Sequence, residues 1–330
     1  ALHRLAEPMI GGIYGGDPSM LSASSTVPQL VEMERAHGSI IRGLMKARSR
    51  QSDSGTSSGP RYGALASFDG GISVLVRSIL KNLPEDCLIT GKSARHIMPG
   101  RNAARWTVLC EDNSSYDADF VVLGTPAEKS AALLTEVNFS LASKLQKITR
   151  SSALIVNLLY DRSKVRHVLN GFGFVVPRTE GMLTSACSFS SIKFAGRSSD
   201  DKLLLRLFTG GAHKAEAADM SDEQLLKQCH SEMQALLGVE ERPLLHVISR
   251  HNEAIPQYLV GHSQLVADIE NDLIASPGIE LIGNSYTGVG LPDCIRTAQS
   301  AARRIREAVN SYLNAPLNPS VNPEMISSLI

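Results

Sequence analysis

The strongest constraint on the fold is a short apolar segment that runs into a glycine-rich turn and then into a long segment with helical spacing. Residues 279–283 read Ile-Glu-Leu-Ile-Gly, the turn over 284–290 contains Gly288 and Gly290, and the helical pattern covers 291–313. This order predicts a strand, a tight turn and a helix. Helix N-termini bind anions through exposed N–H groups, and glycines let a ligand approach the backbone. The turn fits a dinucleotide's pyrophosphate or a flavin's ribityl chain, with an ordinary tight turn as the alternative.

A second strand-to-helix unit has the same order. The apolar residues 120–123 end at Gly124-Thr125-Pro126, and a helical pattern starts at Ala127. A strand leading into a proline-started helix is typical of a βα unit. Further strands are expected around Ile89 and Ile97 and over 106–110, 153–160, 172–176, 183–189, 203–209 and 245–249, and further helices over 72–80, 221–237 and 262–275. The pattern predicts an α/β fold with α+β character.

The N-terminal part is expected to be helical but interrupted. Residues 1–26 are rich in Gly, Ser and Pro, which predicts short helical turns joined by tight loops. The apolar spacing over 28–48 predicts a helix or a helix pair broken near Gly38. Residues 49–60 form a polar low-complexity stretch, for which we predict an exposed loop. The proline- and asparagine-rich tail over 314–330 is expected to be flexible.

Several site classes are excluded by missing motifs. No G-x-G-x-x-G follows a predicted strand, and Gly171-Phe172-Gly173-Phe174 continues as Val-Val-Pro. No G-x-x-x-x-G-K-[ST] occurs, so the visible motifs do not build a complete nucleotide site. The nine histidines form no H-E-x-x-H, and no serine lies in a G-x-S-x-G setting. We therefore expect no metal site and no serine hydrolase.

Charge and composition narrow the function classes further. Lys+Arg and Asp+Glu are both 33, and this balance argues against a nucleic-acid binder held by bulk electrostatics. A hydrophobic content of 43% is enough for a sizeable core, while the apolar runs are too short to cross a bilayer. Five cysteines without C-x-x-C spacing fit reduced thiols in a cytoplasmic protein. The cations Arg42, Lys46, Arg48 and Arg50 form either a solvated helix face or a contact with membrane lipid.

Seven segments, in order and across nearly the whole chain, carry a resemblance to a known family. They are Glu7–Ser22, Ser67–Leu75, Tyr116–Ala127, Gly171–Pro177, Phe208–Gly211, Ala254–His262 and Gly283–Leu291. Together they resemble the oxygen-dependent, flavin-containing protoporphyrinogen oxidases, whose relatives include a coproporphyrinogen-oxidising branch. The third segment is shared more widely among flavin amine oxidases, whereas Gly11–Ser22 argues against an amine oxidase or a carotenoid desaturase. The resemblance covers the C-terminal portion of a family chain, without the G-x-G-x-x-G unit that holds the FAD pyrophosphate, so we expect this chain to be N-terminally incomplete.

The resemblance implies two groups of site residues and no acid–base catalyst. The turn residues match the segment that lies along the flavin, Ala94 matches a backbone contact to adenine, and Thr125 and Pro126 match a strand end near the cofactor. Four further residues match the borders of a substrate cavity. The implied FAD residues are Ala94, Thr125, Pro126, Gly283, Asn284, Ser285, Tyr286, Gly288, Val289 and Gly290, and the implied substrate residues are Phe172, Gly173, Val175 and Phe208.

The implied activity is the oxidation of a porphyrinogen to the porphyrin, with six electrons removed in three flavin cycles and oxygen as the acceptor. Such a bent, apolar macrocycle with carboxylate tails needs an aromatic and aliphatic slot with a cation near its rim. The sequence does not separate protoporphyrinogen from coproporphyrinogen. A different flavin oxidoreductase and a non-catalytic porphyrin-binding remnant are the competing functions.

The resemblance also implies a division into domains. Residues 1–60 would form a partial helical domain that touches the membrane in relatives, and 314–330 would be the tail. The rear part of a two-dinucleotide-type FAD domain would comprise 85–127 and 278–313. A mixed-sheet substrate domain would comprise 61–84 and 128–277. We expect a cytoplasmic protein, peripheral on the inner face of the plasma membrane as one alternative, with a homodimer among the open oligomeric states.

Overall fold

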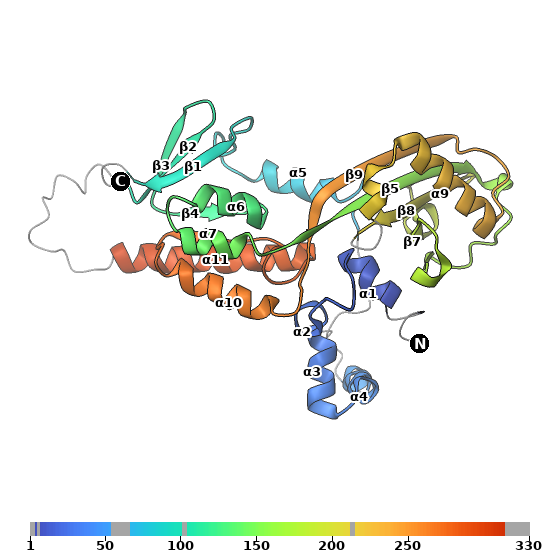
Figure 1. Cartoon of the computed structure of the whole chain (residues 1–330), viewed down its shortest axis with the longest axis horizontal. Helices are drawn as coiled ribbons and strands as arrows, with labels where there is room; N and C mark the ends of the chain where they lie inside the picture. Colours follow the sequence, from blue (N-terminus) through green and yellow to red (C-terminus); the bar gives the residue numbers. More distant parts are fainter. Residues whose placement is uncertain (1–3, 5–6, 54–66, 101–103, 212–214, 314–330) are drawn as a thin grey trace, which may run out of the picture. The chain divides into compact units, whose positions relative to one another are not determined.

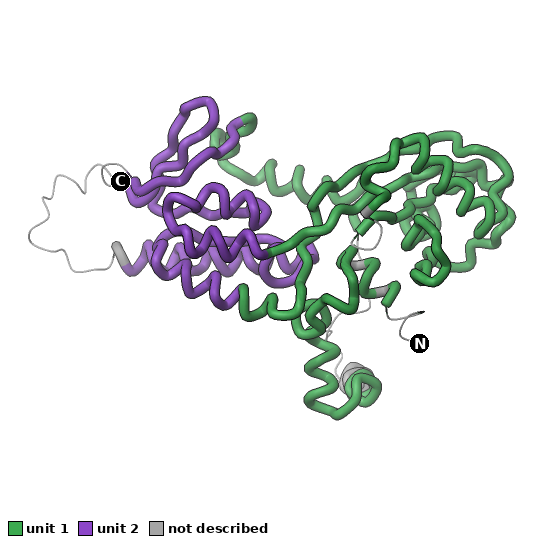
Figure 2. The backbone as a smooth tube through the Cα atoms, viewed as in Figure 1, with its two compact units in different colours: residues 1–91, 148–265 green, residues 92–147, 266–330 purple. Residues whose placement is uncertain are grey.

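The computed structural model describes residues 4, 7–53, 67–100, 104–211 and 215–313. The chain divides into two units, one of residues 1–91 and 148–265 and the other of 92–147 and 266–330 (Figure 2). These boundaries differ from the predicted domains: 128–147 and 266–277 join the second unit, whereas 1–60 and 85–91 join the first. Contacts between 128–147 and 266–277 account for the first difference: Asn138 Nδ2 donates to Ser276 Oγ, and Lys144 pairs with Asp272 at 2.7 Å. The predicted tail lies outside the described residues.

Unit 1 is built on a five-stranded sheet with the strand order β6-β7-β8-β5-β9. Its strands are β5 (Arg150–Asp161), β6 (Gly173–Val175), β7 (Ala186–Phe189), β8 (Lys202–Gly210) and β9 (Leu245–Pro256). All pairings among these described strands are antiparallel, so the expected mixed sheet is wrong for this unit. The only parallel pair among the described strands lies in unit 2.

The core of unit 1 follows from the alternation of buried side chains in β5 and β8. Every second side chain is buried in β8 and, from Leu154 onward, in β5, as a half-buried strand of period two requires. Helix α9 (Asp222–Leu237) covers this face with Cys229, Met233 and Leu237 (Figure 1). It begins with a capping box and ends at a left-handed Gly238, which confirms the predicted helix over 221–237.

The N-terminal helices also belong to unit 1. Gly38, with φ 67°, separates α3 from α4, and a Cβ on Gly43 of α4 would come 2.7 Å from Met33 Cβ of α3, so these helices pack closely. The predicted break near Gly38 is thus confirmed. The predicted loop over 49–60 is wrong for 49–53, which continue α4, and its remainder lies outside the described residues. The helices are α1 (Glu7–Tyr14), α2 (Ala23–Thr26), α3 (Pro28–His37), α4 (Ile40–Asp53) and α5 (Ser73–Lys81).

Short elements connect the larger ones. Ile89, expected in a strand, lies instead in an irregular segment after α5. The connecting elements of unit 1 are α8 (Ser190–Lys193) and the 3₁₀ helices η2 (Arg162–Lys164), η3 (Arg178–Glu180) and η4 (Ala215–Asp219).

Unit 2 contains an antiparallel meander and a parallel strand pair. The meander consists of β1 (Ala94–Pro99), β2 (Trp106–Cys110) and β3 (Ser115–Ala118). The parallel pair is β4 (Val121–Leu123) with β10 (Ile279–Leu281), in which Val121 lies opposite Ile279. Its helices are α6 (Ala127–Leu134), α7 (Phe139–Leu145) and α11 (Leu291–Leu313), and α10 (His262–Leu273) begins in unit 1 and ends here.

Two negative findings apply to the part of the chain that the structure describes. Within it, no helix combines the length and the apolar character needed to cross a membrane. The same residues bring together no group of three His, Cys, Asp or Glu side chains suited to holding a metal ion.

Candidate functional site

The first candidate site is the carboxyl end of the parallel pair in unit 2. β4 and β10 run in the same direction, and each leads into a helix, α6 after Thr125-Pro126 and α11 after the glycine-rich turn. In open α/β sheets, ligands bind in the crevice beyond the carboxyl ends of parallel strands. The two strand-to-helix units predicted from sequence therefore meet where a cofactor would bind.

Glycines shape this strand end in two ways. Gly283 has φ 106°, and a Cβ there would meet only the Gly124 carbonyl oxygen, at 3.9 Å. Gly283 thus leaves open space next to the backbone that a side chain would fill, whereas a Cβ on Gly124 would contact Ile282 Cγ1 at 3.6 Å. Gly288, with φ 78°, is required for packing, because its Cβ would come 2.6 Å from Asp293 Cβ and overlap the Asp293 carboxylate.

Buried side chains tie the turn to the first strand-to-helix unit. Ser285 is 2% exposed, and its Oγ accepts a hydrogen bond from the Ala127 N–H at 3.3 Å, at the start of α6. Thr125 Oγ1 and Ser130 Oγ lie 2.9 Å apart at the same helix end. Burial raises the pKa of Tyr286 to about 12, although the Ser130 side chain opposes that shift. Ser285, Tyr286 and Thr125 thus hold the site together, whatever they do for a ligand.

The N-terminus of α11 carries its own carboxylate. Asp293 Oδ2 accepts a hydrogen bond from the Gly290 N–H at 3.3 Å, and Asp293 Oδ1 pairs with Arg296 at 2.7 Å. A carboxylate in the first turn satisfies the helix dipole from within the chain. This charge disfavours a phosphate at the turn and leaves neutral hydroxyl or amide groups as better ligands.

The remaining predicted cofactor residues lie in unit 2 as well. Asn284 and Val289 are half-buried within the turn. Ala94 begins β1, an exposed edge strand of the meander rather than of the parallel pair, and the pairing of β1 with β2 is irregular between Ala94 and His96. An exposed edge backbone suits a ligand contact through main-chain groups, so Ala94 stays a prediction.

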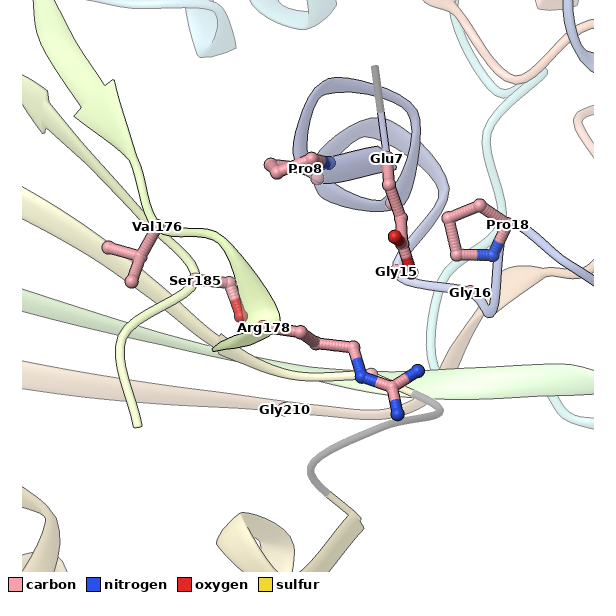
Figure 3. A pocket seen from close by; sticks show the side chains of 12 residues that line it. Glu7, Pro8, Gly15, Gly16, Pro18, Val176, Arg178, Ser185 and Gly210 are labelled. Atoms are coloured by element: carbon pink, nitrogen blue, oxygen red, sulfur yellow. The ribbon is translucent and has the colours of Figure 1, made fainter. Parts of the chain in front are cut away.

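The second candidate site is a pocket in unit 1 with an open volume of about 510 Å³ (Figure 3). It is formed by α1, the end of β8 and the segment that follows β6. Four of the seven family-like segments meet here or directly behind it, although they are far apart in the sequence. Its lining consists of Glu7, Pro8, Gly11, Gly12, Gly15, Gly16, Pro18, Val176, Arg178, Ser185, Gly210 and Gly211.

The glycines of this pocket permit close backbone approach. A Cβ on Gly211, which has φ 86°, would come 2.6 Å from the Gly15 carbonyl oxygen. Behind Gly16 lies the buried Gln257, whose Nε2 donates to the Tyr14 carbonyl at 2.8 Å and to Ser151 Oγ at 2.9 Å. A Cβ on Gly16 would overlap Gln257 Oε1. The glycine-rich motifs are therefore explained by packing of α1 against the ends of β5, β8 and β9.

The loop between β6 and β7 brings polar groups to the pocket and is held by a buried carboxylate. Glu232 of α9, 5% exposed, accepts hydrogen bonds from the Leu183 N–H at 2.6 Å and the Thr184 N–H at 2.9 Å. Burial by itself would raise the pKa of Glu232, but these hydrogen bonds and one from Gln228 outweigh burial and lower it. The loop that presents Arg178 and Ser185 is therefore fixed in place.

The predicted substrate residues lie beside this pocket but do not line it. Phe172 and Val175 are 66% and 42% exposed, while Phe208 of β8 lies under the Arg206 guanidinium at 5.5 Å. Gly173 has φ 147°, and a Cβ there would overlap the Cys187 carbonyl oxygen of β7. Gly173 is thus required for strand pairing, and the substrate roles of all four residues stay predictions.

Sequence reasoning missed Arg178, Gln257 and Glu232. Gln257 lies inside the family-like segment Ala254–His262, and Arg178 directly follows the segment that ends at Pro177. Their positions in or next to these segments could therefore have identified both residues as candidates. Glu232 had none, since an amphipathic helix usually exposes its carboxylates and only the loop packed on α9 gives this one its partners.

Comparison with known proteins gives one family match over most of the chain. The profile described as "Flavin containing amine oxidoreductase" matches residues 1–306. The chain is 28% identical to Coproporphyrinogen III oxidase of Bacillus subtilis over 91% of this chain and 63% of the relative. It is 28% identical to Protoporphyrinogen oxidase 2, chloroplastic/mitochondrial, of Arabidopsis thaliana over 95% of this chain and 65% of the relative. The chain thus spans less than two thirds of the length of these relatives.

Solved structures give the same result at the level of fold. The crystal structure of a candidate protoporphyrinogen oxidase from Exiguobacterium superposes with a TM-score of 0.77 at 27% identity, covering 92% of this chain and 63% of that one. A reduced UDP-galactopyranose mutase superposes with a TM-score of 0.58 at 13% identity, which is a likeness of fold alone.

Proposed function

Because the chain belongs to the family of flavin containing amine oxidoreductases, we propose that it oxidises a porphyrinogen to the porphyrin, with oxygen as the electron acceptor. Membership confirms the family resemblance and, at the level of the family, the FAD prediction. The observation that carries the proposal is the convergence of family-like segments on one pocket in unit 1: three of them line it, and a fourth lies behind Gly16 through Gln257. The names of the similar proteins from Bacillus and Arabidopsis support the same substrate class.

We assign the cofactor to the strand end in unit 2. When bound, FAD would supply the electron acceptor for the oxidation. The open space at Gly283 would let a ribityl chain lie against the backbone, and Asp293 favours neutral hydroxyls over a pyrophosphate there. Of the two ligands considered for the turn, the ribityl chain therefore fits better. Unit 1 would then hold the substrate, bordered by Phe172, Gly173, Val175 and Phe208.

The assay of this function is porphyrin formation. The chain supplied with FAD and either coproporphyrinogen III or protoporphyrinogen IX in air should produce porphyrin fluorescence faster than spontaneous oxidation, and should consume oxygen. Omission of FAD is the control and should return the rate to background. A chain that binds porphyrin but never exceeds the background rate would support the non-catalytic alternative instead.

We further propose that α4 contacts an anionic membrane surface. Ile41 and Met45 lie one helical turn apart, are 69% and 68% exposed, and have Arg42 and Lys46 beside them. Exposed apolar side chains next to cations suit an interfacial helix, and each cation contributes about 1 kcal/mol near an anionic surface.

The double variant Ile41→Ser/Met45→Ser should therefore lose co-sedimentation with anionic vesicles by severalfold, and neutral vesicles should bind the unaltered chain more weakly. Leu244→Ser, which alters an exposed leucine outside α4, is the matched control. Equal sedimentation of the double variant and the control would overturn the membrane contact.

A further inference from the structure

We propose that Arg178 binds a carboxylate tail of the substrate at the mouth of the unit 1 pocket; this inference rests on the proposed porphyrinogen oxidation. Arg178 begins η3, directly after Val176 and Pro177. Figure 3 shows its side chain extending across the pocket below Glu7 of α1. The residue is exposed, as a group at the rim of a pocket must be to meet a solvated ligand.

The loop that carries Arg178 is anchored on both sides. Val176 N–H donates to the Ser185 carbonyl at 2.8 Å, and Thr209 Oγ1 donates to the Leu183 carbonyl at 2.7 Å. The Glu232 carboxylate holds the same loop from α9. The backbone that presents Arg178 is therefore fixed before a ligand binds, and such preorganisation lowers the cost of binding.

Of the parts of the proposed substrate, the carboxylate tail is the one that best matches the charge of Arg178. Among the described lining residues, Arg178 is the only one with a cationic side chain. A guanidinium has five N–H donors and can bind a carboxylate in bidentate fashion. The glycine wall places no side chain in the way of the ligand's arm.

Glu7 lines the same pocket and opposes an anion. Its carboxylate can accept hydrogen bonds from pyrrole N–H groups, and a porphyrinogen carries both these donors and carboxylate tails. A ligand with carboxylates alone would be repelled by Glu7, whereas a porphyrinogen satisfies both charges. The pair Glu7 and Arg178 therefore favours this substrate class over simple carboxylic acids.

The test is a fluorescence titration of the flavin-free chain with coproporphyrin III, and with its tetramethyl ester, which lacks the charges. Arg178→Met should weaken binding of the free acid by about tenfold or more, as expected for a charge-assisted hydrogen bond, and leave the ester unchanged. Arg178→Lys should retain part of the affinity, because it keeps the charge but not the bidentate geometry.

Arg242→Met, which removes an exposed arginine outside the pocket, is the matched control and should bind the free acid like the unaltered chain. The dependence of free-acid affinity on salt should become shallower in Arg178→Met alone.

Glu7→Gln should change the affinity for the free acid in the direction opposite to Arg178→Met. Removing the opposing charge should raise the affinity for the free acid relative to the affinity for the ester severalfold, because only the free acid carries the carboxylates that Glu7 repels. Equal free-acid affinity of Arg178→Met and the unaltered chain overturns the role of Arg178, and so does equal affinity of the unaltered chain for acid and ester. Either result leaves the proposed function standing. If the unaltered chain binds neither porphyrin, the proposed function itself is contradicted.

Discussion

Gly173→Ala should destabilise unit 1 by about 3–5 kcal/mol, as expected where a new side chain must displace backbone. Gly173 has φ 147°, and its added Cβ would overlap the Cys187 carbonyl oxygen and come 3.0 Å from Ser188 Cα. Both groups belong to β7, which cannot move without breaking its pairing with β8. The free energy of unfolding in urea measures the effect.

Gly171→Ala is the matched control for this prediction. A Cβ on Gly171 has no heavy atom within 4 Å, and Gly171 is not among the glycines with positive φ. The control should therefore change the free energy of unfolding by less than about 1 kcal/mol. If the two variants unfold alike, β6 does not pair with β7 in the register described here.

Glu232→Ala should cost about 3 kcal/mol at neutral pH, because it leaves the buried N–H groups of Leu183 and Thr184 without their acceptor. Glu232→Gln should cost less, since an amide keeps one acceptor oxygen. Glu223→Ala, an exposed position on the same helix, should cost less than about 1 kcal/mol. Urea unfolding of the four proteins gives these differences directly.

The contribution of Glu232 to the free energy of unfolding should decrease as the pH falls. Its pKa in the folded protein lies below the ordinary value of 4.5, so its contribution to stability is complete above that value. The contribution is lost as the pH falls through the lower folded-state pKa. The difference between the unaltered protein and Glu232→Gln should hence shrink in acid; a difference that grows in acid would refute the assigned hydrogen bonds.

The strands and helices of unit 1 could be predicted where the local sequence is distinctive. β5 and β8 contain the apolar runs Ala153–Val156 and Leu203–Leu205, and α9 has a Ser221–Gln224 capping box and a C-terminal Gly238. These local features mark the positions of the three elements. The polar residues 49–53 misled the prediction, because arginine and glutamine continue a helix as readily as they form a loop.

The pocket could not be predicted in the same way, since it depends on which distant segments meet. The motif residues Gly15, Gly16 and Gly211 were visible in the sequence, but the sequence does not show that their backbones approach each other. Arg178 belongs to the pocket only because the β6–β7 loop lies opposite α1, which the sequence does not show. The antiparallel order of the sheet could not be predicted from these strands, because continuous apolar runs such as Ala153–Val156 and Leu203–Leu205 are more typical of parallel sheets.

The central claim is that a porphyrinogen, and not an amine, gives electrons to flavin held by this chain. The most direct measurement is the absorbance of the chain with FAD in the absence of oxygen after mixing with coproporphyrinogen III, and separately with putrescine. The account predicts bleaching of the flavin band with the porphyrinogen, growth of the porphyrin band once oxygen is admitted, and no change with putrescine. Bleaching by putrescine without any response to the porphyrinogen would contradict it.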